Sequence, residues 1–253
     1  MTTLVFLIAV GFAAGTLGSM LGVGGGIIMV PALTALNMPP TQVSSTSLVA
    51  VTSTSISSTI EYSRQRRIDY RLSLELGACA IPGAVLGAIL SDYIPEDTFK
   101  MYFGILLIFT GLYILYKNII LTQPSVRKRS VTLRSIVFIA AFCSGVISSL
   151  FGVGGGIIFV PAMVLVLGLT MHRAAATSQL TLLMTSLSGV FTHSFLGHPQ
   201  YVQALALSAG AFIGAQLGAR ISKMTKEGLL QKLLAIMLIG VAITYILDAL
   251  AVW

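Results

Sequence analysis

The sequence predicts an all-α integral membrane protein made of two inverted-topology repeats of about five helical segments each. Three observations predict this fold class: the composition, an internal repeat and the distribution of basic residues. Hydrophobic residues make up 56% of the 253-residue chain and charged residues only 9%, against about 25% charged residues in a soluble domain. A soluble fold of this length would lack polar surface, which argues against a cytosolic enzyme, a nucleic-acid-binding domain or a disordered chain.

Ten apolar segments follow one another within a single transmembrane domain, residues 1–253. Most approach the ~20 residues that a membrane-spanning helix needs. The second and seventh are shorter, so we predict eight full-length spans plus two short, broken helices. Each short segment follows a glycine run and should end or kink near its proline, Pro31 or Pro161. The predicted segments are 3–21, 26–37, 42–60, 72–91, 99–117, 133–151, 156–168, 174–196, 201–221 and 229–251.

The two halves of the chain resemble each other. Residues 15–32 read GTLGSMLGVGGGIIMVPA and residues 145–162 read GVISSLFGVGGGIIFVPA, with twelve of the eighteen positions identical. A Thr-Ser pair recurs at an offset of 131 residues, and a row of spaced glycines recurs further on. Similarity at a fixed period indicates repeats, which we place at residues 1–121 and 131–253.

The basic residues orient the segments. With ten crossings and the N-terminus outside, 14 of the 15 Lys and Arg residues lie on the cytoplasmic side, leaving only Lys100 outside. Treating each glycine-interrupted pair as one broken span gives eight crossings and a 9 to 6 split, so the positive-inside rule favours ten. Five segments per half is an odd number, so the second half is inverted, as in many secondary transporters. The predicted cytoplasmic loops are 61–71, 117–134 and 220–232, and loops 92–98 and 197–200 lie outside.

The net charge of +7 then reflects cytoplasmic loops that face anionic lipid, not a nucleic-acid-binding surface. We therefore expect a multi-pass protein of the cell (plasma or inner) membrane, with the lipid bilayer as its surroundings. The oligomeric state stays open, with a homodimer as one option.

The two glycine runs, residues 22–26 and 152–156, are the sharpest candidates for a binding site. Glycine permits unusual backbone conformations, and a helix N-terminus offers unpaired N–H donors and a partial positive charge that favour an anion. Inversion would bring the two short helices into the membrane from opposite sides, with their N-termini converging near the midplane. The alternative is close helix packing through small residues. The candidates are Gly24, Gly25, Gly26, Gly154, Gly155 and Gly156.

Hydroxyl groups form a second candidate set, at Thr46, Ser47, Thr177 and Ser178. Hydroxyls can satisfy an oxyanion without adding a full charge, whereas the alternative is hydrogen bonding back to helix carbonyls. Arg173 lies close to the second pair and is either an anion-attracting residue at the cytoplasmic mouth or an ordinary loop residue.

Signals for other chemistry are weak. His193 is either a proton shuttle or a satisfied histidine near the outer end of its helix. No carboxylate pair in the apolar segments marks a cation site, and no catalytic triad, HExxH motif or paired acids occur. Cys79 and Cys143 have no Cys or His neighbour at metal-ligand spacing. We expect no enzyme activity, no metal and no cofactor.

The duplicated motif resembles the sulfite exporter TauE/SafE family. The resemblance rests on GxxGxxxGVGGGxxxVPAL, the following TSL, RRIDY in the basic loop and PGAVLGA, and it covers nearly the whole chain. It implies export of sulfite, sulfoacetate or related sulfur-containing anions, with the glycines and Thr-Ser pairs named above as substrate-binding residues. The family is usually drawn with eight membrane helices, so counting the two short helices separately explains our ten. Gln179 departs from the TSL pattern, as TSQL, and is a candidate for tuning substrate choice.

The leading hypothesis is a secondary transporter that exports a small sulfur-containing anion held at helix N-termini near the midplane. Uniport and proton coupling would both suffice. The alternatives are a non-transporting membrane scaffold or subunit, and a cation transporter or channel.

Overall fold

A computed structural model describes residues 2–95, 98–99, 101–105, 107–108 and 131–251. The described residues form helices and short connections, without a strand, so the predicted all-α class is confirmed. Residues 98–99, 101–105 and 107–108 are helical. The remaining elements are α1 Thr2–Leu21, α2 Gly26–Thr34, α3 Pro40–Arg64, α4 Tyr70–Leu90, the short 3-10 helix η1 Ser91–Tyr93, α6 Val131–Phe151, α7 Gly156–Leu165, α8 Met171–Phe195, α9 Tyr201–Met224 and α10 Glu227–Ala251.

Each predicted segment within the described residues coincides with one helix. The fifth predicted segment, 99–117, lies partly outside the described residues. Lys100 and most of the loop 117–134 lie outside them. The prolines do not end the short helices: α2 continues from Pro31 to Thr34 and α7 from Pro161 to Leu165. Packed membrane helices tolerate proline because neighbouring groups compensate for the lost hydrogen bond.

Three of the described helical stretches are long and apolar enough to cross a membrane. They are α1, α9 and the continuous stretch Tyr70–Tyr93 formed by α4 and η1. Apolar side chains stand on their outer faces, where Val5, Leu205 and Ile213 are more than half exposed. Such a surface fits contact with lipid. The division into eight long spans and two short ones stays a prediction.

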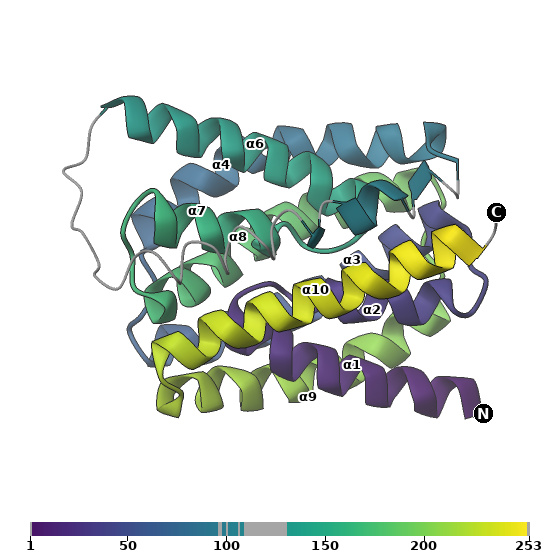
Figure 1. Cartoon of the computed structure of the whole chain (residues 1–253), viewed down its shortest axis with the longest axis horizontal. Coiled ribbons are helices and arrows are strands. Elements are labelled where there is room, and N and C mark those ends of the chain that lie inside the picture. The colour runs from purple at the N-terminus through teal and green to yellow at the C-terminus, as the bar shows by residue number, and fades with distance from the viewer. Residues whose placement is uncertain (1, 96–97, 100, 106, 109–130, 252–253) are drawn as a thin grey trace.

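The two halves interdigitate. The first helix of each half packs along the fourth helix of the other half, α1 along α9 and α6 along α4, and α3 and α8 complete the pairing by contacting α9 and α4 respectively. Figure 1 shows α1 beginning and α10 ending at one end of the bundle, at the right of the view, while α6 begins at the opposite end.

Rows of glycine make these pairings close, because any side chain would meet backbone of the facing helix. Gly210, Gly214 and Gly218 of α9 lie against the carbonyl groups of residues 8, 12 and 16 in α1. Gly83 and Gly87 of α4 lie against Phe142 and Val146 of α6 in the same way. Small residues at regular spacing allow such contact between membrane helices, so these five glycines have a packing role.

Candidate functional site

Each glycine run reverses the chain. In the first run, Gly22, Gly24 and Gly25 have positive φ angles of 80°, 86° and 86°, which side-chain-bearing residues rarely adopt. The turn carries Gly25 back onto α1, where a Cβ added to it would lie 2.6 Å from the Ala14 carbonyl oxygen. In the second run, Ser144 of α6 donates a 2.7 Å hydrogen bond to the Gly155 carbonyl. Both short helices therefore start alongside the helix that precedes them.

The two runs meet in the interior. A Cβ on Gly26 would lie 2.5 Å from the Gly152 carbonyl oxygen, and a Cβ on Gly156 would lie 2.5 Å from the Gly22 carbonyl oxygen. Residues 22–26 and 152–156 are all buried. The predicted convergence of the two runs is thus present as direct backbone contact between segments 130 residues apart.

The start of α2 leaves buried donors unpaired. The N–H groups of Ile28 and Met29 donate to the Gly25 carbonyl, at 3.0 and 3.3 Å. The N–H groups of Gly25, Gly26 and Ile27 have no acceptor among the described residues. A buried N–H without a partner is costly, and helix N-termini carry a partial positive charge. This arrangement is suited to an anion.

The start of α7 has the same character. Gly156 N–H donates to the Gly154 carbonyl at 2.7 Å, and the N–H groups of Ile158 and Phe159 donate to the Gly155 carbonyl. Within the part of the chain that the structure describes, the N–H groups of Gly155 and Ile157 find no acceptor. Two helix starts with free donors are therefore in contact with each other.

The duplicated serines cross between the halves. Ser47 donates to the Gly152 carbonyl at 2.8 Å, and Ser178 donates to the Gly22 carbonyl at 2.7 Å. Both serines are fully buried. Each therefore holds the glycine run of the opposite half, and neither makes the local bond to its own helix that was the alternative interpretation.

The duplicated threonines also cross between the halves. Thr46 Oγ1 accepts from the backbone N–H of Gln200, which precedes α9, and Thr177 Oγ1 accepts from that of Asp69, which precedes α4, each at 3.1 Å. A hydroxyl that accepts a hydrogen bond keeps its own hydrogen for a further acceptor. Each threonine hydroxyl therefore accepts a bond that joins the halves and can still donate its hydrogen to another group.

Gln179 lies beside the first run and Arg173 does not. The Gln179 amide donates to the Gly18 carbonyl at 3.0 Å and accepts from Ser55 at 3.3 Å, and Gly18 packs directly on Gly25. Arg173 is exposed in the first turn of α8, and no contact among the described residues joins its guanidinium to the runs. The glycines, Ser47, Ser178 and Gln179 are thus brought together, whereas the printed bonds of Thr46 and Thr177 lead to the starts of α9 and α4, and Arg173 is left apart.

Two apolar residues cover the glycine runs, and the sequence did not identify either of them as part of the site. Val51 and Leu182 lie one helical turn beyond Ser47 and Ser178, at corresponding positions of the two halves. A Cβ on Gly24 would lie 3.0 Å from Val51 Cγ1 and 3.2 Å from Leu182 Cδ1, and Gly154 faces the same two side chains. An apolar residue in an apolar helix carries no signal except its place in the repeat.

Arg67 is a third such residue, because the sequence placed it only in the basic loop 61–71. Its Nη1 atom is buried and has no hydrogen-bond partner among the described residues. A buried guanidinium nitrogen without a partner is costly. Arg67 is therefore a better candidate than Arg173 for contact with an anion.

The chain matches the sulfite exporter TauE/SafE family over residues 7–245. It belongs to this family. This TauE/SafE protein is 32% identical to the probable membrane transporter protein YunE of Bacillus subtilis. The alignment runs over 265 residues and covers 95% of this chain and 97% of the relative. It is 30% identical to the probable membrane transporter protein ORF9 of Sinorhizobium sp, covering 97% and 93%.

A third TauE/SafE relative is the probable membrane transporter protein YfcA of Escherichia coli K12, at 27% identity over 91% of this chain and 84% of the relative. No solved structure matches the chain. The family expected from the duplicated motif is thus confirmed, and with it a membrane transporter.

Proposed function

We propose that this protein is a secondary transporter that exports a small sulfur-containing anion, such as sulfite, sulfoacetate or a related organosulfonate. Family membership supports the substrate class. The position of the binding site is supported by the contact between the starts of α2 and α7, where buried N–H groups lack acceptors among the described residues. An anion bound there would pair those donors.

The same arrangement disfavours the alternative of a cation transporter. A cation at the runs would meet the positive ends of two helices. Among the described residues no carboxylate contacts the glycines to compensate for it. An unpaired charge in a dry site is costly. A scaffold without transport activity would have no use for two helix starts whose N–H groups lack acceptors among the described residues.

We infer that the halves, residues 1–121 and 131–253, are inverted repeats within one transmembrane domain. The bond from Ser47 to Gly152 is matched by that from Ser178 to Gly22, and the pairing of α1 with α9 is matched by that of α6 with α4. A pseudo-two-fold axis between the halves explains this pattern, because it exchanges each residue or helix with its counterpart in the other half. The opposite starting ends of α1 and α6 support inversion, and inverted repeats commonly provide alternating access.

The membrane potential favours the proposed direction. Each negative charge that leaves a negative-inside cell gains about 2.3 kcal/mol per 100 mV. Export therefore needs no nucleotide. We place the protein in the cell membrane as a multi-pass protein.

The inverted arrangement predicts that both termini lie outside the cell, with loops 61–71 and 220–232 in the cytoplasm. The reason is the charge distribution, because these loops carry eight of the basic residues. A topology reporter fused after the last residue should therefore report an external C-terminus. Labelling of single cysteines introduced at Arg66 and Lys223 gives the complementary measurement. A cytoplasmic C-terminus would contradict the inverted arrangement.

Flux from proteoliposomes tests the transport proposal directly. Vesicles should be loaded in turn with sulfite, thiosulfate, sulfoacetate, taurine, sulfate, phosphate, sodium or potassium. We expect saturable flux of at least one sulfur-containing anion, and the same anion should raise the unfolding temperature of the purified protein, because a ligand of the folded state stabilises it. Flux of a cation without anion dependence, or no flux from folded protein, would refute the proposal.

A further inference from the structure

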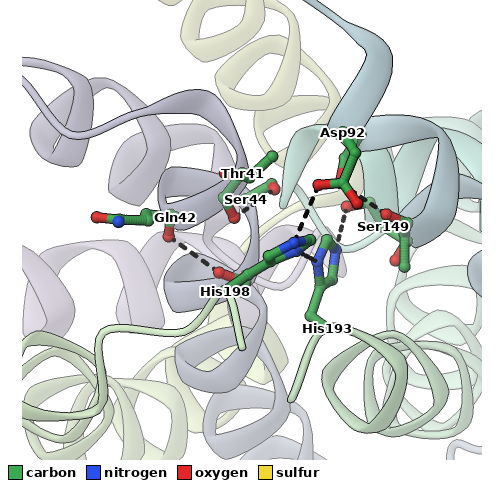
Figure 2. Close-up of polar contacts among 10 residues, drawn as sticks. Thr41, Gln42, Ser44, Asp92, Ser149, His193 and His198 are labelled. Atoms are coloured by element: carbon green, nitrogen blue, oxygen red, sulfur yellow. Dashed lines mark hydrogen bonds and ion pairs between the residues drawn. The ribbon is translucent and has the colours of Figure 1, made fainter. Parts of the chain in front are cut away.

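Two histidines connect the surface to the end of α6 through a continuous chain of polar contacts (Figure 2). His198, in the loop between α8 and α9, places Nε2 3.0 Å from Asp92 Oδ1 of η1. Its Nδ1 lies 2.9 Å from Nδ1 of His193, in the last turn of α8. His193 Nε2 lies 3.0 Å from the Ser149 carbonyl oxygen of α6.

The chain of contacts determines how many protons the pair holds. A carbonyl oxygen only accepts, so His193 Nε2 carries a hydrogen, and a carboxylate only accepts, so His198 Nε2 carries one too. The contact between the two Nδ1 atoms needs one more hydrogen between them. Two neutral imidazoles carry two hydrogens in total, and this geometry requires three. The count stays the same if one of these protons resides on Asp92.

Asp92 provides both the negative charge that balances the extra proton and its route from the surface. Asp92 is the ionisable side chain in contact with the pair among the described residues. Thr41, Gln42 and Ser44, drawn at the start of α3 in Figure 2, are uncharged, as is Ser149. The side chain of Asp92 is 41% exposed and that of His198 13% exposed, whereas His193 is fully buried. A proton can therefore pass inward from Asp92.

The first half of the protein shows what the same position does without histidine. Tyr62 corresponds to His193 at the repeat offset of 131, and it donates a 2.8 Å hydrogen bond to the carbonyl of Ser19, the counterpart of Ser149. Arg67 stands at the position of His198. The bond to the α6 carbonyl is thus within the reach of tyrosine, and histidine is not needed for it. What the second half adds is an imidazole, a group that can gain and release a proton.

Loss of the proton would act on the second glycine run. Two deprotonated Nδ1 atoms 2.9 Å apart would repel each other, so the rings would have to separate. His193 holds the carbonyl of Ser149, and the adjacent Ser148 carbonyl accepts from the N–H of Gly152, which starts the run. Movement of His193 therefore disturbs the turn on which the proposed anion site is built.

We propose that His193 and His198 form a binding site for one proton, which enters through Asp92, and that this site couples anion transport to protons. The coupling rests on the proposed transport function, whereas the proton site itself does not. In the bound state one N–H bond joins the proton to the pair. On release the proton passes to water through the Asp92 carboxylate.

Nuclear magnetic resonance tests the proton site without transport. The chain has three histidines, so selective ¹⁵N-histidine labelling gives few signals, with His172 as an internal reference. We expect one proton shared by the two Nδ1 atoms at acidic pH, and its loss as the pH rises. In His198→Gln the shared proton should be absent. Two independent neutral rings throughout the range from pH 5 to 8 would overturn the proposal.

Proteoliposomes test the coupling. With one proton per anion, a one-unit pH gradient should change anion accumulation about ten-fold. His193→Tyr, which copies Tyr62, should abolish this response, and His172→Gln should retain it because His172 contacts Ser222, Thr225 and Glu227 instead. If His193→Tyr fails to fold, His198→Gln serves in its place, since that side chain is nearer the surface.

The outcomes separate the two proposals. Measurable anion flux that ignores the gradient, or an equal response in the variants, would refute the coupling and leave the transport function standing. Absence of any anion flux would refute the transport function and with it the coupling. The labelled-histidine spectra would still decide whether the proton site exists.

Discussion

Gly26→Ala is expected to abolish transport and to lower the free energy of unfolding, while Gly240→Ala should do neither. Gly26 has an ordinary helical backbone, so alanine there adds no conformational strain. Its Cβ would lie 2.5 Å from the Gly152 carbonyl oxygen and 2.6 Å from Val153 Cα. Both contacts are with backbone, so the two runs must move apart. Overpacking of this kind costs about 1–3 kcal/mol.

Gly240 is the matched control for this prediction. It lies within helix α10, and a Cβ added to it would meet nothing within 4 Å. Alanine is favoured over glycine in a helix by about 1 kcal/mol, so Gly240→Ala should be neutral or stabilising. Thermal unfolding of the purified proteins and flux from proteoliposomes are the measurements. Wild-type flux in Gly26→Ala would remove the reason for placing the substrate at the runs.

A second pair separates crowding from backbone conformation. Gly25 and Gly197 both have positive φ, 86° and 74°, but only Gly25 is crowded by α1. Alanine at either position pays for a left-handed conformation, roughly 1–2 kcal/mol. Gly25→Ala should therefore be the more damaging of the two, and equal losses would show that conformation alone matters.

Thr46→Val and Thr177→Val are expected to lower both stability and anion affinity. Each change keeps the shape of the side chain but leaves the N–H of Gln200 or Asp69 without its acceptor. An unpaired buried donor costs about 1–3 kcal/mol, and because Asp69 and Gln200 are half-buried this range is an upper limit here. Each variant also loses a hydroxyl donor that we propose for the anion. A lost hydrogen bond to a charged ligand corresponds to a roughly ten- to hundred-fold weaker affinity.

Two other threonines in the same helices provide the controls. Thr54 of α3 and Thr185 of α8 are fully buried, but their hydroxyls bond to the preceding turn of their own helix, at 3.0 and 2.8 Å. Their valine variants should change stability and affinity little. The readouts are thermal unfolding and the substrate dependence of flux. Affinity unchanged in Thr46→Val and Thr177→Val would show that these hydroxyls only join the halves.

The sequence by itself determined the class of this protein, the helices and the family. Low charge and long apolar segments leave only a membrane environment for the backbone, where helices satisfy their own hydrogen bonds. The bounds of α1, α6 and α10 lie within two residues of the predictions at each end. The repeat identified both glycine runs, because positive φ and backbone crowding leave glycine as the residue that fits.

The tertiary structure decided which groups meet. Ser47 and Gly152 are 105 residues apart, and Asp69 and Thr177 are 108 residues apart. No local sequence pattern therefore predicts their hydrogen bonds. The sequence treated His193 as a lone histidine, because Ser149, which it contacts, and Asp92, which contacts its neighbour His198, lie on other elements. Periodicity and propensity act over a few residues, whereas a hydrogen bond across the bundle depends on how whole helices pack.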